Sequence, residues 1–471
     1  MREFDVLVLG GGPAGCRAAI ESARLRPGIR VALVERMAVV GGVCVNTGTI
    51  PSKTLREAVL YLAGYRQRAY YGRDYRLKEP ITQADLTERT QHVIEAELRV
   101  LQSQLGRLGV ELISGDARFV GPHEVEVASC TCRATDRVRA EAIVVATGSE
   151  ALRTPGIPYD GRTVIVPDDL YRLAELPRSM TIVGGGVIGS EYASIYGLAG
   201  VAVTLVDARP RLLEFLDGEI RDLCVAEMQR NGVTFALGRT PDRVETTADG
   251  RVRTTFRDGG ELVSDLLMTA AGRTGSVASL NLPAAGLAAD ARGRIAVDAC
   301  FRTSQPHIFA AGDVIGFPSL ASAATEQGRV LAAVAAGREA PPLSRLLPLG
   351  IYTIPELAAV GRTEAALSRA GVPYAAARAR WSEVSRGHIA GDEVGLLKLL
   401  WHRETREILG VHIVGESAAE LIHLGHAVMA LGGTVDYFIE SVFNYPTLAQ
   451  AYKLAADEIP PLATDPGANE S

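Results

Sequence analysis

Glycines near the N-terminus have a type and spacing suited to binding the diphosphate of a dinucleotide. Gly10, Gly12 and Gly15 form a G-x-G-x-x-G pattern directly after the apolar stretch Phe4–Leu9. The first glycine permits a tight turn, the second lets the backbone approach a diphosphate, and the third lets a helix pack closely on a strand. The free amides of that helix then face the phosphates. Glu35 follows 20 residues after Gly15, where an acid accepts hydrogen bonds from ribose hydroxyls.

A second copy of this arrangement lies in the middle of the chain. Gly184, Gly186 and Gly189 follow the apolar stretch Thr181–Val183, and the next apolar stretch ends at Asp207. One glycine pattern alone is weak evidence, because glycines also mark ordinary turns. In both copies, however, strand, glycines, helix, second strand and acid occur in order. Two complete copies predict two bound dinucleotides.

Charged residues after the second copy bear on which nucleotide binds there. Asp207 suits the two hydroxyls of an unmodified ribose, and its charge would repel a 2′-phosphate. Arg209 and Arg211 follow closely. Guanidinium groups at these positions could pair with that phosphate, although ordinary surface arginines are the alternative. We therefore expect this site to accept both phosphorylated and unphosphorylated nucleotides.

The remaining segments predict an α/β protein with three parts. The 471 residues suggest roughly three domains. Ile143–Gly148 and Leu266–Gly272 read as buried strands that end in glycine, and His307–Asp313 reads as a strand that ends in glycine and an acid. Asp313 could bind a ribityl hydroxyl or cap a helix. After Leu346, strands near Gly395–Leu400 and Ile408–Val414 and a helix over Ala418–Leu431 indicate a separate α+β domain.

Composition excludes several functional classes. The net charge of −6, with both signs mixed along the chain, argues against a nucleic-acid binder. No apolar stretch approaches the length of a membrane span or a signal sequence, so we expect a cytoplasmic protein with no membrane partner. The six cysteines are scattered, and no cluster of His or Cys lies near Cys130 and Cys132. We expect these two to alternate along a strand, with no metal site.

The segment GGVCVNTGTIPSK at residues 41–53 resembles the active-site helix of the pyridine nucleotide–disulfide oxidoreductases. The resemblance covers almost the whole chain and includes both glycine patterns, Ala146–Gly148, Ala311–Asp313 and the YTIPE segment at 352–356. It implies a glutathione-reductase-like fold, FAD in the first unit, NAD(H) or NADP(H) in the second, and homodimerisation through the C-terminal domain. The implied domains are 1–150 with 272–345 for FAD, 151–271 for NAD(P), and 346–460 for the interface, before a disordered tail at 461–471.

The same resemblance implies the site residues. Lys53 and Glu191 would form a catalytic pair beside the flavin, where a cation stabilises negative charge. Cys44 is interpreted as a small buried apolar residue in contact with the flavin rather than a reactive thiol. The implied FAD site comprises Gly10, Gly12, Gly15, Glu35, Arg36, Gly41, Gly42, Cys44, Thr49, Lys53, Thr147, Gly148 and Asp313, and the implied NAD(P) site comprises Gly184, Gly186, Gly189, Glu191, Asp207, Arg209 and Gly272.

Three departures from the disulfide-reducing members of the family point to a different electron acceptor. Thr49 stands where those members have the second cysteine, Tyr445 where they have a histidine, and Gln450 where they have the acid that orients it. A dithiol cannot form from Cys44 and a hydroxyl, and a phenol is a poor general base at neutral pH. One branch of the family, the soluble pyridine nucleotide transhydrogenases, resembles this chain at Thr49 and Tyr445.

The resemblance to that branch implies hydride transfer between NADPH and NAD through FAD. Donor and acceptor would use one nucleotide site in turn, so the kinetics would be ping-pong. Residues 45–47 read VNT where the branch has Thr-His-Trp, which leaves the electron acceptor open. The alternatives are an NAD(P)H diaphorase or quinone reductase, and a non-enzymatic FAD-binding partner protein.

Overall fold

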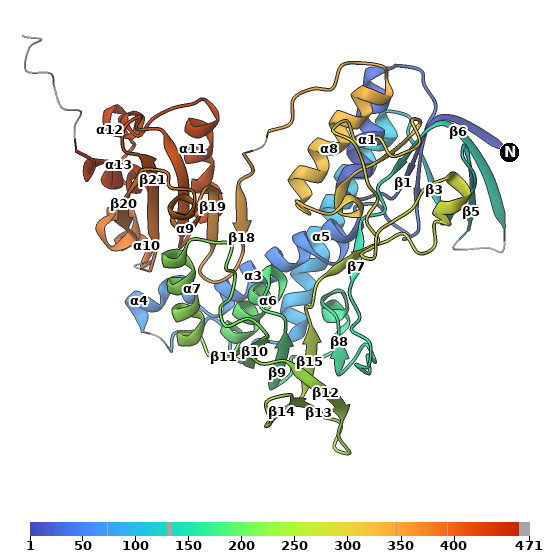
Figure 1. Ribbon diagram of the computed structural model, residues 1–471. Helices are drawn as coiled ribbons and strands as arrows, with labels where there is room; N and C mark the ends of the chain where they lie inside the picture. Colours follow the sequence, from blue (N-terminus) through green and yellow to red (C-terminus); the bar gives the residue numbers. More distant parts are fainter. Residues whose placement is uncertain (73, 130–133, 345, 393, 461–471) are drawn as a thin grey trace, which may run out of the picture.

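The computed structural model describes residues 1–460 apart from 73, 130–133, 345 and 393. Two mainly parallel sheets and a separate antiparallel sheet form the architecture (Figure 1), which confirms the expected α/β class with a third α+β part. The expectations for Cys130, Cys132 and the 461–471 tail fall outside the described residues. Among the described helices, none combines the length and apolar character that crossing a membrane requires.

The first sheet carries the N-terminal glycine pattern. Residues Val6 to Leu9 of its central strand β1 are all buried, because this strand has parallel neighbours on both sides. The order is β3 (Glu111–Ser114), β2 (Val31–Glu35), β1 (Arg2–Leu9), β6 (Thr135–Val145), β5 (Glu124–Ala128) and β4 (Asp116–Gly121), with β17 (Ile308–Ala310) also paired to β6. Helices α1 (Pro13–Leu25), α8 (Ala321–Ala335) and α5 (Gln83–Arg107) belong to this part of the fold.

The segment at 41–53, which resembles the family's active-site helix, is divided at Thr47 and Gly48. Helix α2 (Gly42–Asn46) ends there, and α3 (Thr49–Leu62) begins after Gly48, which has an irregular backbone. Short helical turns η1 (Tyr65–Gln67) and α4 (Arg68–Tyr71) follow α3. The expected strand over His307–Asp313 is also shorter: β17 ends at Ala310, and Asp313 lies in the 3-10 turn η4 (Gly312–Ile315).

The second sheet is parallel throughout and carries the second glycine pattern. Its order is β11 (Val233–Leu237), β10 (Ala202–Asp207), β9 (Ser179–Val183), β15 (Leu266–Thr269) and β8 (Val164–Ile165). Helices α6 (Val187–Leu198) and α7 (Gly218–Arg230) pack on it, together with the 3-10 turn η2 (Pro167–Arg172). A small antiparallel sheet of β12 (Pro241–Thr246), β13 (Val252–Phe256) and β14 (Glu261–Ser264) extends from it. The antiparallel ribbon of β7 (Ser149–Ala151) and β16 (Arg273–Gly275) links the two units.

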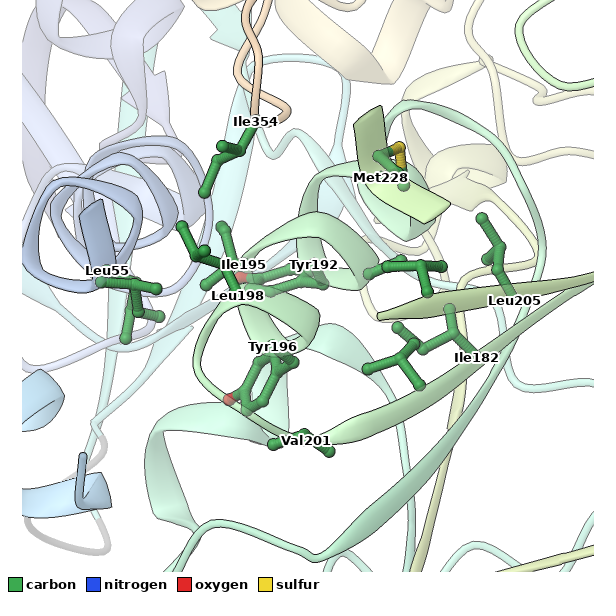
Figure 2. Packing of buried hydrophobic residues seen from close by; sticks show 14 of the residues in the cluster. Leu55, Ile182, Tyr192, Ile195, Tyr196, Leu198, Val201, Leu205, Met228 and Ile354 are labelled. Carbon is green, nitrogen blue, oxygen red and sulfur yellow. The ribbon is translucent and has the colours of Figure 1, made fainter. Parts of the chain in front are cut away.

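Helix α6 is buried on every face from Gly189 to Leu198, so it forms the centre of the molecule rather than a surface layer. Figure 2 shows its Ile195 and Leu198 between Leu55 of α3 and Ile354 of the C-terminal part. One hydrophobic core therefore joins segments from all three parts of the chain, and it fixes their relative positions at the place where α3 and α6 meet.

The C-terminal part is an antiparallel sheet flanked by helices. Its order is β18 (Leu349–Ile351), β19 (Leu357–Gly361), β22 (Ile408–Val414), β21 (Leu396–His402) and β20 (Tyr374–Arg380). The helices are α9 (Glu364–Arg369), α10 (Ser385–Ala390), α11 (Ala418–Ala430), α12 (Asp436–Glu440) and α13 (Gln450–Asp457). In Figure 1 this part, drawn in orange and red, lies beside α7.

Candidate active site

Both glycine patterns form open cradles at a helix start. A Cβ on Gly15 would lie 1.9 Å from the carbonyl oxygen of Gly10, and a Cβ on Gly189 would lie equally close, 1.9 Å, to that of Gly184. Only glycine allows this contact between helix and turn. The middle glycine, Gly12 in the first unit, caps its helix without a side chain and has open space where a Cβ would point. Gly186 does the same in the second unit, so each helix presents free amides to an anion.

The acids that end the two second strands are held in the same way. Glu35 accepts hydrogen bonds from the amides of Gly11 at 2.7 Å and Met37 at 2.9 Å. Asp207 accepts equivalent bonds from the amides of Gly185 at 2.5 Å and Arg209 at 2.8 Å. The two units thus present a carboxylate at matching positions beside their cradles.

The two units differ in the side chain that lies two residues after the acid. In the first unit it is the apolar Met37. In the second unit, the Arg209 guanidinium donates two hydrogen bonds to the Asp207 carboxylate. Nε lies 2.9 Å from Oδ1, and a terminal nitrogen lies 2.8 Å from Oδ2. Burial alone would raise the pKa of Asp207, but these hydrogen bonds and the two amides hold it below its usual value. The sequence suggested Arg209 as a partner for a phosphate and did not indicate that it neutralises the neighbouring acid.

A hollow lies along the first cradle. Thr147 Oγ1 is buried there and, among the described residues, has no hydrogen-bond partner. An unpaired buried hydroxyl in a glycine-lined hollow fits a polar ligand such as a dinucleotide. The predicted residues that line it are Gly10, Gly12, Glu35, Arg36, Gly42, Thr147, Gly148 and Asp313. Gly41 adjoins it, with its amide 2.7 Å from the carbonyl of Gly11.

Asp313 belongs to a polar chain that sequence reasoning missed. Its Oδ2 accepts a hydrogen bond from Ser149 Oγ at 2.6 Å, and Arg273 Nε donates to the same Ser149 oxygen at 2.8 Å. Arg273 also lies 3.5 Å from Asp168, so this series of polar contacts extends from the first unit to the second. Gly272 precedes Arg273 with φ +123, which places the arginine at this crossing. The adjacent glycine–arginine pair was the only available signal in the sequence.

Lys53 and Glu191, predicted as a pair from positions 138 residues apart, are in contact. Lys53 Nζ lies 2.7 Å from Glu191 Oε2 and 3.2 Å from Ser52 Oγ. The Lys53 side chain is 25% exposed and that of Glu191 is 6% exposed. This pair joins α3 to α6, and neither of its residues lines the glycine hollow.

The residues at the positions of the disulfide machinery occupy two separate places. Cys44 in α2 is half-buried, and burial raises the pKa of its thiol above the usual value against an opposing hydrogen bond from Thr49. Tyr445 is 67% exposed and its hydroxyl lies 2.7 Å from Ser385 Oγ on the C-terminal surface. Gln450 begins α13. Within the described chain, these groups do not form a relay that reaches Cys44.

Comparison with known proteins places this geometry in a family. Residues 4–328 match the model of the pyridine nucleotide-disulphide oxidoreductases, and residues 347–456 match the model of their dimerisation domain. The soluble pyridine nucleotide transhydrogenase of Mycobacterium tuberculosis (strain ATCC 25177 / H37Ra) is 47% identical over 459 residues, which cover 98% of this chain and 97% of that protein. The protein of the same name from Colwellia psychrerythraea is 42% identical, over 96% of this chain and 97% of its own.

Structural similarity agrees with the sequence matches. The crystal structure of LpdA from Mycobacterium tuberculosis superposes with a TM-score of 0.88 at 26% sequence identity. The superposition covers 97% of this chain and 99% of LpdA, so all three parts of the fold are shared. The chain therefore belongs to the pyridine nucleotide-disulphide oxidoreductases, flavoproteins that use pyridine nucleotides.

Proposed function

We propose that this protein is an FAD-dependent NAD(P)+ transhydrogenase that passes hydride from NADPH to NAD. One observation carries the proposal: the Lys53–Glu191 pair is formed, while Thr49, Tyr445 and Gln450 occupy the positions of the disulfide machinery. The relatives that match over nearly the whole chain bear the transhydrogenase name, which favours the same activity here. A diaphorase or quinone reductase is the alternative enzyme, and a non-enzymatic FAD-binding protein is the other.

Residues of the first unit would hold FAD. Gly12 and the start of α1 would bind its diphosphate, Glu35 a ribose, and Thr147 and Asp313 its ribityl end. Bound FAD would supply the chemistry by accepting and returning hydride. The proposed boundaries are 1–150 with 272–345 for this unit and 151–271 for the nucleotide unit. The matched dimerisation domain indicates a homo-oligomer, and we propose a homodimer formed through residues 346–460.

The protein side of the reaction requires positioning and charge rather than a proton relay. Gly186 and the start of α6 would bind the diphosphate of NADPH, and Asp207 with Arg209 would contact its adenosine ribose. Lys53 would keep a positive charge beside the reacting rings, and Glu191 would orient that ammonium. NADPH and NAD would occupy this one site in turn, because only one of the two cradles remains for a nicotinamide nucleotide.

The decisive experiment compares electron acceptors on the purified protein. With NADPH as donor, we expect rapid reduction of thio-NAD, slow reduction of quinones and no reduction of lipoamide or glutathione disulfide. Double-reciprocal plots for NADPH and NAD should give parallel lines, and denatured protein should release FAD. Faster turnover with a quinone than with thio-NAD would support the diaphorase alternative. Intersecting lines would indicate a second nicotinamide site.

Arg209 is expected to determine whether the site accepts a 2′-phosphate. Arg209→Met copies the arrangement of the first unit, where Met37 follows Glu35, and it leaves the Asp207 charge uncompensated. A charge-assisted hydrogen bond contributes about 1.5–3 kcal/mol. We therefore expect NADPH to bind about 10- to 100-fold more weakly, with a change of less than about threefold for NADH. The dissociation constants of both nucleotides can be measured by titration.

Arg211, which is exposed and was the second arginine indicated by the sequence, provides the matched comparison. Arg211→Met is expected to weaken NADPH less than Arg209→Met does, because Arg209 is the residue on Asp207. Equal losses of NADH and NADPH in Arg209→Met would refute the assignment.

A further inference from the structure

The YTIPE segment at 352–356 of the C-terminal part is bonded to both helices that carry the proposed catalytic pair, α3 and α6. On α6, Glu191 Oε1 accepts a hydrogen bond from the Tyr352 amide at 2.9 Å, and Ser194 Oγ accepts one from the Ile354 amide at 3.1 Å. Two residues of α6, three apart, thus hold alternate amides of one segment, which bends over residues 353–355. Ile354 also packs into the core beside α3 and α6 (Figure 2).

The same segment is fastened to α3 by a buried arginine. Arg56 Nε donates to the Thr353 carbonyl at 3.0 Å, and Arg56 pairs with Glu356 at 3.0 Å. The Arg56 side chain is only 2% exposed. A buried charge with buried partners fixes its neighbours in one arrangement, because separation would leave a charge unpaired. The segment therefore has one position relative to Lys53, which lies one turn before Arg56.

Tyr352 contacts both members of the pair in different ways. Its amide binds Glu191, and its ring centre lies 4.9 Å from Lys53 Nζ. At that separation the negative face of an aromatic ring attracts an ammonium group. Unlike a second carboxylate, the ring holds the cation without cancelling its charge. The ammonium is partly exposed, so the ring also limits the directions in which it can turn toward water.

We propose that Tyr352 is a positioning residue that holds the Lys53 ammonium in its productive place through its ring. The inference rests on the proposed function, because it assumes that the Lys53 charge assists hydride transfer. Tyr352 belongs to the C-terminal part of the chain, whereas Lys53 and Glu191 belong to the other two parts. We assign the contribution to the ring, because the ring centre is the group that lies 4.9 Å from Lys53 Nζ.

Three replacements at this position separate the ring from its hydroxyl and from its shape. Tyr352→Phe keeps the ring, Tyr352→Leu removes it, and replacement by pentafluorophenylalanine keeps the shape but reverses the charge distribution of the face. We expect the holoenzyme with Tyr352→Phe to transfer hydride from NADPH within about twofold of the wild-type rate. The other two should be slower on the order of tenfold, the size of a partly desolvated cation–π contact.

The midpoint potential of the bound flavin provides a readout other than activity. A cation held close stabilises the negative charge that reduction adds, so Tyr352→Leu and the pentafluoro replacement should shift the potential to more negative values, and Tyr352→Phe should not. The NADPH dissociation constant and the melting temperature should be unchanged in all three. If Tyr352→Leu does not fold, the pentafluoro replacement alone decides the matter, because it preserves the packing.

A Lys53→Met background distinguishes failure of this inference from failure of the proposed function. There, removal of the Tyr352 ring should have no further effect on rate or potential. A slow Lys53→Met protein combined with normal rate and potential in the pentafluoro protein would overturn the role of Tyr352 alone. Equal impairment by Tyr352→Phe and Tyr352→Leu would also overturn it, because the hydroxyl would then be the active group. An unimpaired Lys53→Met protein would overturn the catalytic role on which the inference rests.

Discussion

Lys53→Met is expected to slow hydride transfer from NADPH by about 100-fold or more, because it removes a fixed charge from the place where negative charge develops. Loss of one preorganised electrostatic group of this kind typically costs about 10²–10³ in rate. Methionine retains the length and apolar stem of lysine, so the α3 backbone should be undisturbed. The NADPH dissociation constant should change little, since we propose that the second cradle at Gly184–Gly189 binds the nucleotide. Single-turnover absorbance measurements give both quantities.

The chain offers a matched control for this experiment. Lys78 is an exposed lysine that pairs with Asp85 at 2.5 Å on the surface, away from both cradles. Lys78→Met should leave the rate unchanged. Glu191→Gln should also slow transfer, because glutamine has no charge and only one acceptor oxygen for the two donors that Glu191 binds, the Lys53 ammonium and the Tyr352 amide. Wild-type rates in both Lys53→Met and Glu191→Gln would remove the pair from the mechanism.

Local sequence patterns were sufficient to predict the cradles and most of the elements that carry them. The predicted strand over Ile408–Val414 has those bounds, and the predicted helix over Ala418–Leu431 ends one residue earlier. Such segments have a hydrophobic period, and glycines mark their ends. The positions of Glu35 and Asp207 could also be predicted. Each is the last residue of a strand that runs parallel to the strand before the glycines, so it must lie beside the cradle.

The features that the sequence did not indicate are contacts between side chains of distant segments. Arg209 lies two residues from Asp207, yet nothing in the order of residues shows whether it turns to the acid or to solvent. Tyr352 reaches Lys53 only because the C-terminal part docks on α3 and α6. The break at Gly48 was missed for a similar reason, since the backbone there is irregular while its neighbours are helical.

A buried lysine fastens the C-terminal sheet to the start of α7. Lys398 of β21 has no exposed side-chain surface, and its Nζ lies 2.8 Å from Asp217 and 2.6 Å from Glu219. It also pairs with Glu364. In the described part of the chain these three acids are the only ones grouped closely enough to hold a metal ion, and the ammonium lies among them. Lysine thus supplies the cation that the cluster requires.

Lys398→Met is expected to destabilise the protein by about 3–5 kcal/mol, because removing the lysine leaves the buried Asp217 carboxylate without its ion-pair partner, beside two further acids. The pH dependence provides a second test. Arg378 and Lys398 hold the pKa of Glu219 at about 2, well below that of an unfolded glutamate. The stabilisation is therefore complete near neutral pH and declines as the pH falls toward 2. In the variant, acid instead neutralises the repelling carboxylates, so the difference from wild type should shrink below about pH 4.

Denaturant unfolding of the holoenzyme at pH 7 and pH 3 measures both effects. Arg378→Met is the control, since this arginine pairs with Glu219 from a position that is 38% exposed, where an ion pair contributes about 0–1 kcal/mol. A loss of less than about 1 kcal/mol in Lys398→Met, or an equal loss at both pH values, would contradict the account. The first result would mean that water or the other charges compensate the three acids. The second would mean that packing of the lysine stem, and not its charge, connects the C-terminal part to the nucleotide unit.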